Sequence, residues 1–188
     1  MNHSKTYRQM ALLVVIAALL VGRMANADAV TDWNVKAGEI VVAAKLGTPP
    51  SNRVLAIVQT AVYEATNAIT GRDPASGTSL ESTPDASVEA AIAAANRVTL
   101  AKLVPSQQAA VDAAYQDALA VLTDGPAKSA GIAAGDKAAL AVLALRADDG
   151  FATVETYRPY TTPGVYVPTV IRVFSQWPQR KTSLMLDP

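Results

Sequence analysis

The chain has 188 residues, with 16 basic and 16 acidic side chains, 51% hydrophobic residues and no cysteine. This balance of charge gives no strong field of either sign, which argues against a nucleic-acid-binding or anionic-membrane-binding protein. Without cysteine there is neither a disulfide nor a thiolate ligand, so packing must hold the protein together. The length fits one domain of ordinary size.

The first 27 residues have the pattern of a signal peptide. Lys5 and Arg8 provide a positive start, residues 11–22 are apolar, and residues 25–27 read Ala-Asn-Ala, an A-x-A cleavage signal. This apolar segment is shorter than the roughly 20 residues that a membrane-spanning helix needs. We therefore predict an exported protein, periplasmic or extracellular, that has no membrane anchor after cleavage and begins at Asp28.

Cleavage changes the chemistry that the chain can perform. The mature chain has 13 basic and 16 acidic residues, a net charge of −3, and the only histidine, His3, is lost with the signal peptide. The commonest general base and the usual zinc ligands are then absent, as is any Ser-His-Asp arrangement. We expect no nucleic-acid partner.

Apolar residues at helical spacing predict five helices, and no long alternating pattern indicates a strand. The first helix is expected over residues 33–46, with Asp32 as its N-cap and Gly47 directly after its end. The Thr-Pro-Pro run at 48–50 is expected not to continue a helix.

The second helix is expected over residues 52–69. Ser51 is its predicted N-cap, and Gly71 is placed to end it. Residues 71–84 are rich in Gly, Ser, Thr, Pro and Asp, and they predict a mobile surface loop.

The third and fourth helices are separated by a proline. The third is expected over residues 86–103, with Asp85 as its N-cap and Pro105 beyond its end. The fourth is expected over residues 107–122 and is capped by Ser106 in this interpretation.

The fifth helix is expected over residues 126–146, with Pro126 in its first turn and residues 148–150 closing it. Gly131 and Gly135 are four residues apart on an alanine-rich helix, a spacing that favours close contact with another helix. The fold class is therefore predicted to be all-α, with about five amphipathic, alanine-rich helices in a bundle or layer.

The character of the chain changes at Phe151. Residues 157–168 combine prolines with aromatic side chains and predict an extended or turn-like segment. We predict a helical domain over residues 28–150 and an extended connector over residues 151–188 that leads to a missing catalytic domain. Alanine buries little area per residue, so the helices are expected to pack against that domain or a second copy.

Few side chains are candidates for chemistry. Asp148 and Asp149 are adjacent and are expected to be solvated residues at a helix end. Glu64 and Asn67 share one flank of the second helix, where they form an ordinary polar edge or orient a loop. An autonomous enzyme that used carboxylates alone would depend on Asp148 or Glu64.

The remaining candidates are interpreted as structural. Arg53 and Arg158 are expected to form a structural ion pair or to point to solvent. Trp33 and Trp177 are expected to anchor a core or an interface.

Several short runs are spread over nearly all of the mature chain. They are residues 32–34, 49–56, 61–69, 109–115, 124–128, 145–150, 157–159 and 161–169. Taken together, these runs resemble bacterial vanadium-dependent haloperoxidase-like proteins of the type 2 phosphatidic acid phosphatase superfamily. The resemblance implies an exported enzyme that oxidises halide with peroxide or hydrolyses phosphate esters, with vanadate as the cofactor of the haloperoxidases.

The catalytic motifs of that family are Lys-x6-Arg-Pro, Pro-Ser-Gly-His and a later arginine with a histidine. The only Arg-Pro pair here is Arg158-Pro159, and Phe151 stands where the lysine would be needed. Pro105-Ser106 is followed by two glutamines instead of Gly-His. No catalytic, cofactor-binding or metal-binding residue is therefore assigned, and the motifs are expected beyond the end of this chain.

Two functions follow as hypotheses. In the first, the chain is the N-terminal helical scaffold of an exported haloperoxidase-like or acid phosphatase-like enzyme, and its partner is the missing C-terminal catalytic domain. In the second, it is a free-standing exported helical binding or scaffold module, with a homo-oligomer as a further possibility. Either halide oxidation or phosphate-ester hydrolysis is compatible with the first.

Overall fold

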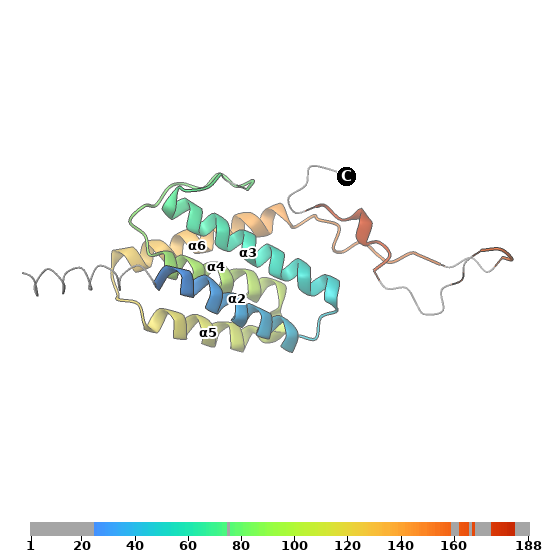
Figure 1. Ribbon diagram of the computed structural model, residues 1–188, viewed down its shortest axis with the longest axis horizontal. Coiled ribbons are helices and arrows are strands. Elements are labelled where there is room, and N and C mark those ends of the chain that lie inside the picture. The colour runs from blue at the N-terminus through green and yellow to red at the C-terminus, as the bar shows by residue number, and fades with distance from the viewer. Residues whose placement is uncertain (1–24, 75, 159–161, 166, 168–173, 183–188) are drawn as a thin grey trace, which may run out of the picture.

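The computed structural model describes residues 25–74, 76–158, 162–165, 167 and 174–182. Over these residues the fold is all-α, as predicted, and contains no strand (Figure 1). The α-helices are α2 (Ala25–Ala43), α3 (Thr48–Thr70), α4 (Val88–Leu103), α5 (Gln108–Ala120) and α6 (Pro126–Leu145), and the short 3-10 helices are η1 (Pro105–Gln107) and η2 (Trp177–Gln179).

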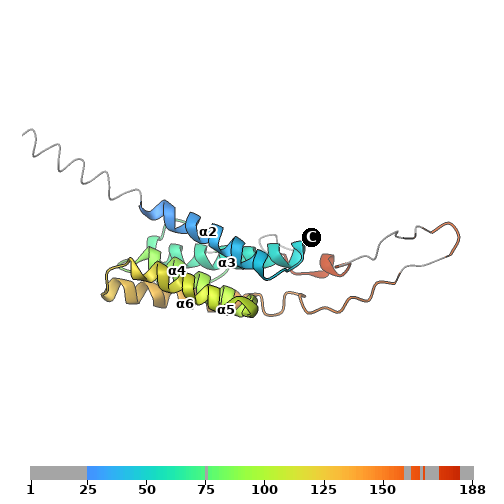
Figure 2. The same cartoon turned by 90° about the horizontal axis from the view of Figure 1, so that it is seen from below.

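Helix α4 is the centre of the bundle. It contacts α2, α3, α5 and α6, and its most extensive contact is with α6. Ile92 and Leu100 of this helix are fully buried, as are the alanines on either side of Ile92. The helices lie side by side along the long axis of the bundle, as Figure 2 shows. Burial of these apolar side chains, at about 25 cal/mol per Å², is the main source of stability.

Helix α2 differs from the predicted first helix at both ends. It begins at Ala25 within the described residues, so Asp32 lies inside it and is not its N-cap. No glycine or proline occurs between Ala25 and Asp32, so nothing stops the helix from including these residues. The predicted cleavage site after Ala27 falls in the first turn of α2.

The prediction that Gly47 follows the end of the first helix was also wrong. Lys45 adopts the left-handed conformation, with φ of 54°, and its N–H donates to the Val42 carbonyl at 3.0 Å. Gly47 does not end α2 but is the N-cap of α3.

Helix α3 begins four residues earlier than predicted because its prolines lie at its start. Pro49 and Pro50 are in the first turn, where N–H groups have no partner inside the helix. Ser51 is therefore a helical residue, not an N-cap. The predicted end is correct, since Gly71 has φ of 59° and donates its N–H to the Asn67 carbonyl at 2.8 Å.

Helix α4 is capped by Ser87 and not by Asp85. The Ser87 hydroxyl accepts a hydrogen bond from the Ala90 N–H at 3.2 Å, and the helix ends at Leu103, before Pro105, as predicted. Ser106 does not cap the fourth helix. It lies in η1, and α5 begins at Gln108.

Helix α6 matches its predicted range to within one residue, and its two glycines lie against α4 as the spacing predicts. A Cβ at Gly131 would stand 2.3 Å from the Ser87 carbonyl oxygen. A Cβ at Gly135 would stand 2.3 Å from the Ala91 carbonyl oxygen. The backbones of α4 and α6 can approach this closely only because both positions lack a side chain.

The segment after α6 turns back towards the bundle. Residues 151–158 have no regular structure, and residues 174–182 contain η2 and contact the end of α6. The rest of the predicted extended connector falls partly on residues outside those that the structure describes. Residues 180–182 contact Arg146 and Phe151 and so pack against the C-terminal end of α6.

Candidate functional site

A buried carboxylate on α3 holds the loop that follows that helix. Glu64 is 2% exposed, and its Oε1 accepts hydrogen bonds from the Ser76 N–H at 2.6 Å and the Ser76 hydroxyl at 2.5 Å. Its Oε2 accepts from the Thr78 hydroxyl at 2.5 Å. These three donors compensate the loss of water around the carboxylate.

Tyr63, directly before Glu64, and Asn67, one turn after it, hold the same loop. The Asn67 side chain donates to the Asp73 carbonyl at 2.6 Å and accepts from the Asp73 N–H at 2.9 Å. The Tyr63 hydroxyl donates to the Pro74 carbonyl at 2.6 Å. The idea that Glu64 and Asn67 orient a loop is thus confirmed, and the loop predicted as mobile is anchored to α3.

We expect Glu64→Gln to lower the free energy of unfolding by roughly 1–2 kcal/mol, because an amide NH2 would face a buried hydrogen-bond donor. Urea unfolding followed by circular dichroism measures this loss. Limited proteolysis is expected to cut the loop faster in the variant. Glu81→Gln, at a side chain that is 82% exposed, is the matched control and should leave both results unchanged. Equal stability of both variants would contradict the anchoring role.

The second polar cluster joins the start of α3 to the end of α6. The carboxylate of Asp149 is 1% exposed, and its Oδ2 accepts from Arg53 Nε at 2.7 Å and from Arg146 Nη2 at 3.0 Å. Its Oδ1 accepts from the Phe151 N–H at 3.1 Å. One buried acid therefore pairs with two arginines from different helix ends.

The returning C-terminal segment completes this cluster. Arg146 donates to the carbonyl oxygens of Thr182 at 2.8 Å and Lys181 at 2.9 Å. The Lys181 N–H donates to the Asp149 carbonyl at 3.1 Å. Residues 181–182 are thus tied to Arg146 and Asp149 by backbone groups.

Aromatic rings cover the charged groups of the cluster. The guanidinium carbons of Arg53 and Arg180 lie 4.5 Å and 4.6 Å from the centre of the Phe151 ring. The Arg180 guanidinium also lies 4.0 Å from the centre of the Trp177 ring. Attraction between a cation and the face of an aromatic ring stabilises both contacts.

The environment moves the pKa of Asp149 below its usual range. Burial alone would raise this pKa, but the hydrogen bond and charge of Arg53, the Phe151 N–H and the charge of Arg146 together outweigh it. The carboxylate is therefore ionised near neutral pH and can hold both arginines.

The sequence interpretation was wrong for Asp149, which is not a solvated residue, and it agrees with the structure for its neighbour Asp148, which is exposed. Arg53 forms the structural ion pair expected of it, and Arg158 lies at the surface. Of the tryptophans, Trp33 is in the core and Trp177 is partly buried against Phe174.

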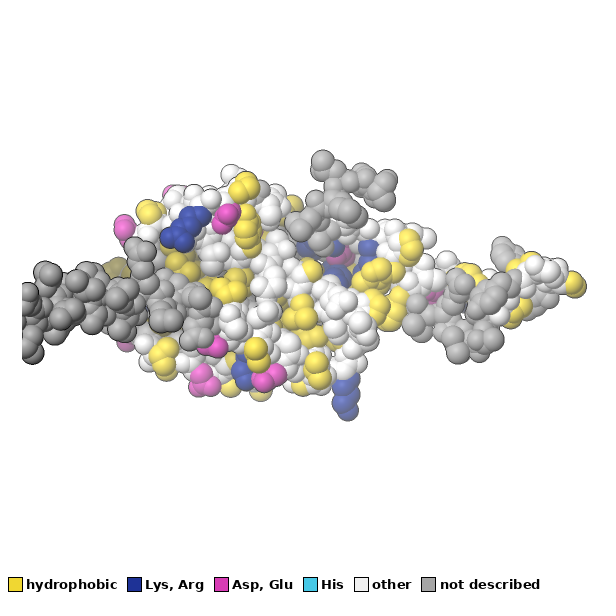
Figure 3. Space-filling model, in the orientation of Figure 1, with side chains coloured by type: hydrophobic (Ala, Val, Ile, Leu, Met, Phe, Trp, Pro, Cys, Tyr) yellow, Lys and Arg dark blue, Asp and Glu magenta, His cyan; other side chains and the backbone are white. Residues whose placement is uncertain are grey.

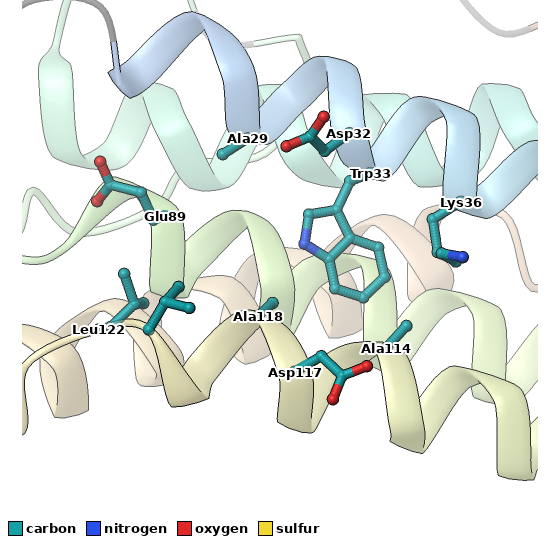
Figure 4. A pocket seen from close by; sticks show the side chains of 10 residues that line it. Ala29, Asp32, Trp33, Lys36, Glu89, Ala114, Asp117, Ala118 and Leu122 are labelled. Carbon is teal, nitrogen blue, oxygen red and sulfur yellow. The ribbon is translucent and has the colours of Figure 1, made fainter.

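A groove between α2 and α5 is a third feature, shown in Figure 4. Its volume is about 510 Å³, Trp33 and Ala118 lie along its apolar part, and Asp32 and Asp117 stand at its edges. Residues on three different helices meet here, so no local sequence motif could have indicated the groove.

The described residues do not fit a vanadate centre. A haloperoxidase site needs an imidazole bonded to vanadium, and the only histidine of the chain, His3, lies outside the part that the structure describes. Nor do three or more His, Cys, Asp or Glu side chains come together in the described ranges in a way that could hold a metal ion.

No family model, curated protein or solved structure matches this chain. Among the helices of the described residues, none is both long enough and apolar enough to cross a membrane.

Proposed function

We propose that this chain is the helical scaffold of an exported haloperoxidase-like or acid phosphatase-like enzyme, with catalysis carried out by a further domain. The observation that carries the proposal is the position in the fold of the short runs that resemble haloperoxidase-like proteins. The run at 49–56 contains Arg53, and the run at 145–150 contains Arg146 and Asp149. These runs are far apart in the chain and meet in one buried ion cluster.

A third run has the same kind of role. The run at 61–69 contains Glu64 and Asn67, which hold the loop after α3. The residues that carry the resemblance thus perform structural work in the bundle, and this is the behaviour expected of a scaffold.

Exposed apolar side chains also favour a neighbour for the bundle. Val42 on α2 is 77% exposed, Val121 after α5 is 82% exposed and Leu140 on α6 is 61% exposed. Covering such side chains with a catalytic domain would remove apolar area from water.

The first test is the intact mass of the native protein from the cells that produce it. The proposal expects a mass larger than that of residues 28–188 by a whole domain, in which Lys-x6-Arg-Pro and Pro-Ser-Gly-His should be found. Vanadate-dependent peroxidase and phosphatase assays on that protein would then identify the reaction. A full-length protein with neither motif nor either activity would contradict the proposal.

A free-standing exported binding module is the second candidate, and the groove beside Trp33 is the observation that favours it. A native mass that matches residues 28–188 would support this candidate. So would a purified chain that is monomeric, unfolds cooperatively and binds no hydrophobic dye, because a scaffold separated from its catalytic domain would expose apolar surface. A measured mass equal to that of a chain beginning at Asp28 would also show that the signal peptide has been removed.

A further inference from the structure

Helices α2 and α5 leave a groove between them because the side chains that face each other there are small. Both helices pack on α4, and they contact each other only slightly. Ala29 on α2 and Ala114 and Ala118 on α5 line the space, and Val121 and Leu122 extend its apolar surface beyond the end of α5. The floor of this groove, whose volume is about 510 Å³, is therefore mainly apolar.

Trp33 of α2 lies along the groove with a hydrogen-bond donor that has no partner. It is 6% exposed, and its indole N–H forms no hydrogen bond with any described residue. In Figure 4 the ring nitrogen faces the side of the groove where Glu89 and Leu122 lie. A buried tryptophan N–H usually has an acceptor. The acceptor for this group must therefore come from a molecule in the groove.

Three acidic side chains stand around the groove, each on a different helix. Asp32 is on α2, Glu89 on α4 and Asp117 on α5, and none of them forms an ion pair within the described ranges. One oxygen of Glu89 accepts from the Ser87 hydroxyl at 3.0 Å. Figure 3 shows acidic side chains among apolar ones where α2 and α5 lie. The groove thus combines an apolar floor with uncompensated negative charge.

Lys36 does not neutralise these acids. It is the only cation among the described residues that line the groove, and its ammonium donates to Glu39 Oε2 at 2.7 Å. The hydrogen bond and charge of Glu39 are the main causes that raise the pKa of Lys36, and the charge of Asp117 is the smallest. The charge of Lys36 is therefore compensated within α2, by an acid that does not line the groove.

We propose that this groove binds an amphiphilic amine, a small molecule with an apolar body, a hydrogen-bond acceptor and a protonated amino group. The apolar body covers the alanines and Leu122, which removes carbon surface from water. The acceptor bonds to the Trp33 N–H, and the ammonium lies among the carboxylates, where hydrogen bonds between charged groups are strong. The volume of the groove is within the range of about 300–1,000 Å³ that small-molecule sites occupy.

The inference goes beyond the proposed scaffold function and does not depend on it. The groove is formed by helices of the bundle, so no further domain is needed to complete it. A failure of the binding experiment would leave the test by intact mass unaffected, and the reverse also holds.

The test compares three ligands that share one apolar chain and one amide carbonyl. At neutral pH the aminoethyl amide of decanoic acid is a cation, the propyl amide is neutral and N-decanoyl-β-alanine is an anion. Isothermal titration calorimetry on the purified protein, below the concentrations at which the ligands form micelles, should show saturable binding of the cation. The neutral ligand should bind about threefold to tenfold more weakly, because several weak surface attractions are lost, and the anion more weakly still.

Two double variants locate the charge. Asp32→Asn combined with Asp117→Asn should weaken binding of the cation about threefold to tenfold and leave binding of the neutral ligand unchanged. Both side chains are exposed, so the unfolding temperature without ligand should stay the same. Glu81→Gln combined with Asp148→Asn is the matched control, because it removes two exposed acids outside the groove, and it should leave the affinity for the cation unchanged.

Ala118→Leu locates the apolar part of the site. The larger side chain would occupy part of the groove, so the cationic and the neutral ligand should both bind more weakly. Equal affinity for all three ligands would indicate a surface that packs against an apolar partner, and it would overturn the proposal. Absence of saturable binding, or full affinity in the Ala118→Leu variant, would overturn it as well.

Discussion

Replacing Asp149 by alanine is expected to lower the free energy of unfolding by about 3–5 kcal/mol, because it leaves two partly buried arginines without their shared carboxylate. Arg53 lies near the start of α3 and Arg146 directly follows α6, and Asp149 is their common ion-pair partner. The Phe151 N–H would lose its acceptor at the same time. Urea unfolding followed by circular dichroism measures the change.

The adjacent acid provides the control. Asp148 has the same charge and lies next to Asp149, but it is exposed. Asp148→Ala is therefore expected to change the free energy of unfolding by no more than about 0.5 kcal/mol. If the two variants had equal stability, the structural role of the ion cluster would be refuted.

The pH dependence of the same pair of proteins tests the electrostatic cause. The pKa of Asp149 is lower in the folded protein than the value of about 3.9 expected in the unfolded chain. Its contribution to stability is therefore fully present above that value and is lost as the pH falls through the folded pKa. The stability difference between wild type and Asp149→Ala should shrink below about pH 4 and stay constant from pH 5 to 7.

Gly135→Ala is expected to lower the free energy of unfolding by about 1–3 kcal/mol, although alanine is the better helix former. A Cβ at this position would stand 2.3 Å from the Ala91 carbonyl oxygen and 2.8 Å from the Ala94 Cβ. Both atoms belong to the helix at the centre of the bundle, so α4 and α6 would have to move apart. Thermal and urea unfolding both report the loss.

A second helical glycine gives the opposite expectation. Gly38 lies in α2, and a Cβ there would meet nothing within 4 Å. Gly38→Ala should raise the free energy of unfolding by about 0.5–1 kcal/mol, because it restricts the unfolded chain without any steric conflict. A stabilising effect at both positions would contradict the close contact between α4 and α6.

Features that depend on neighbouring residues could be predicted from the sequence. The all-α class and the approximate ranges of the helices follow from apolar periodicity, and Gly71 and Pro126 end and begin their helices as expected. The spacing of Gly131 and Gly135 also predicted the close contact of α6 with another helix, because residues four apart lie on the same face of a helix. The errors at Asp32, Gly47 and Asp85 are local, because several adjacent residues can cap or end a helix and packing selects one of them.

The candidate site was decided only by the tertiary structure. Asp149 looked like any acid at a helix end, and its burial depends on Arg53, which is 96 residues away. The cluster around Asp149 likewise combines a residue of α3, the residues directly after α6 and residues 181–182. Helical periodicity is a property of residues three and four apart, so the sequence by itself determines it. Burial and ion pairing arise from segments brought together by folding, and no local pattern records which charge will meet which.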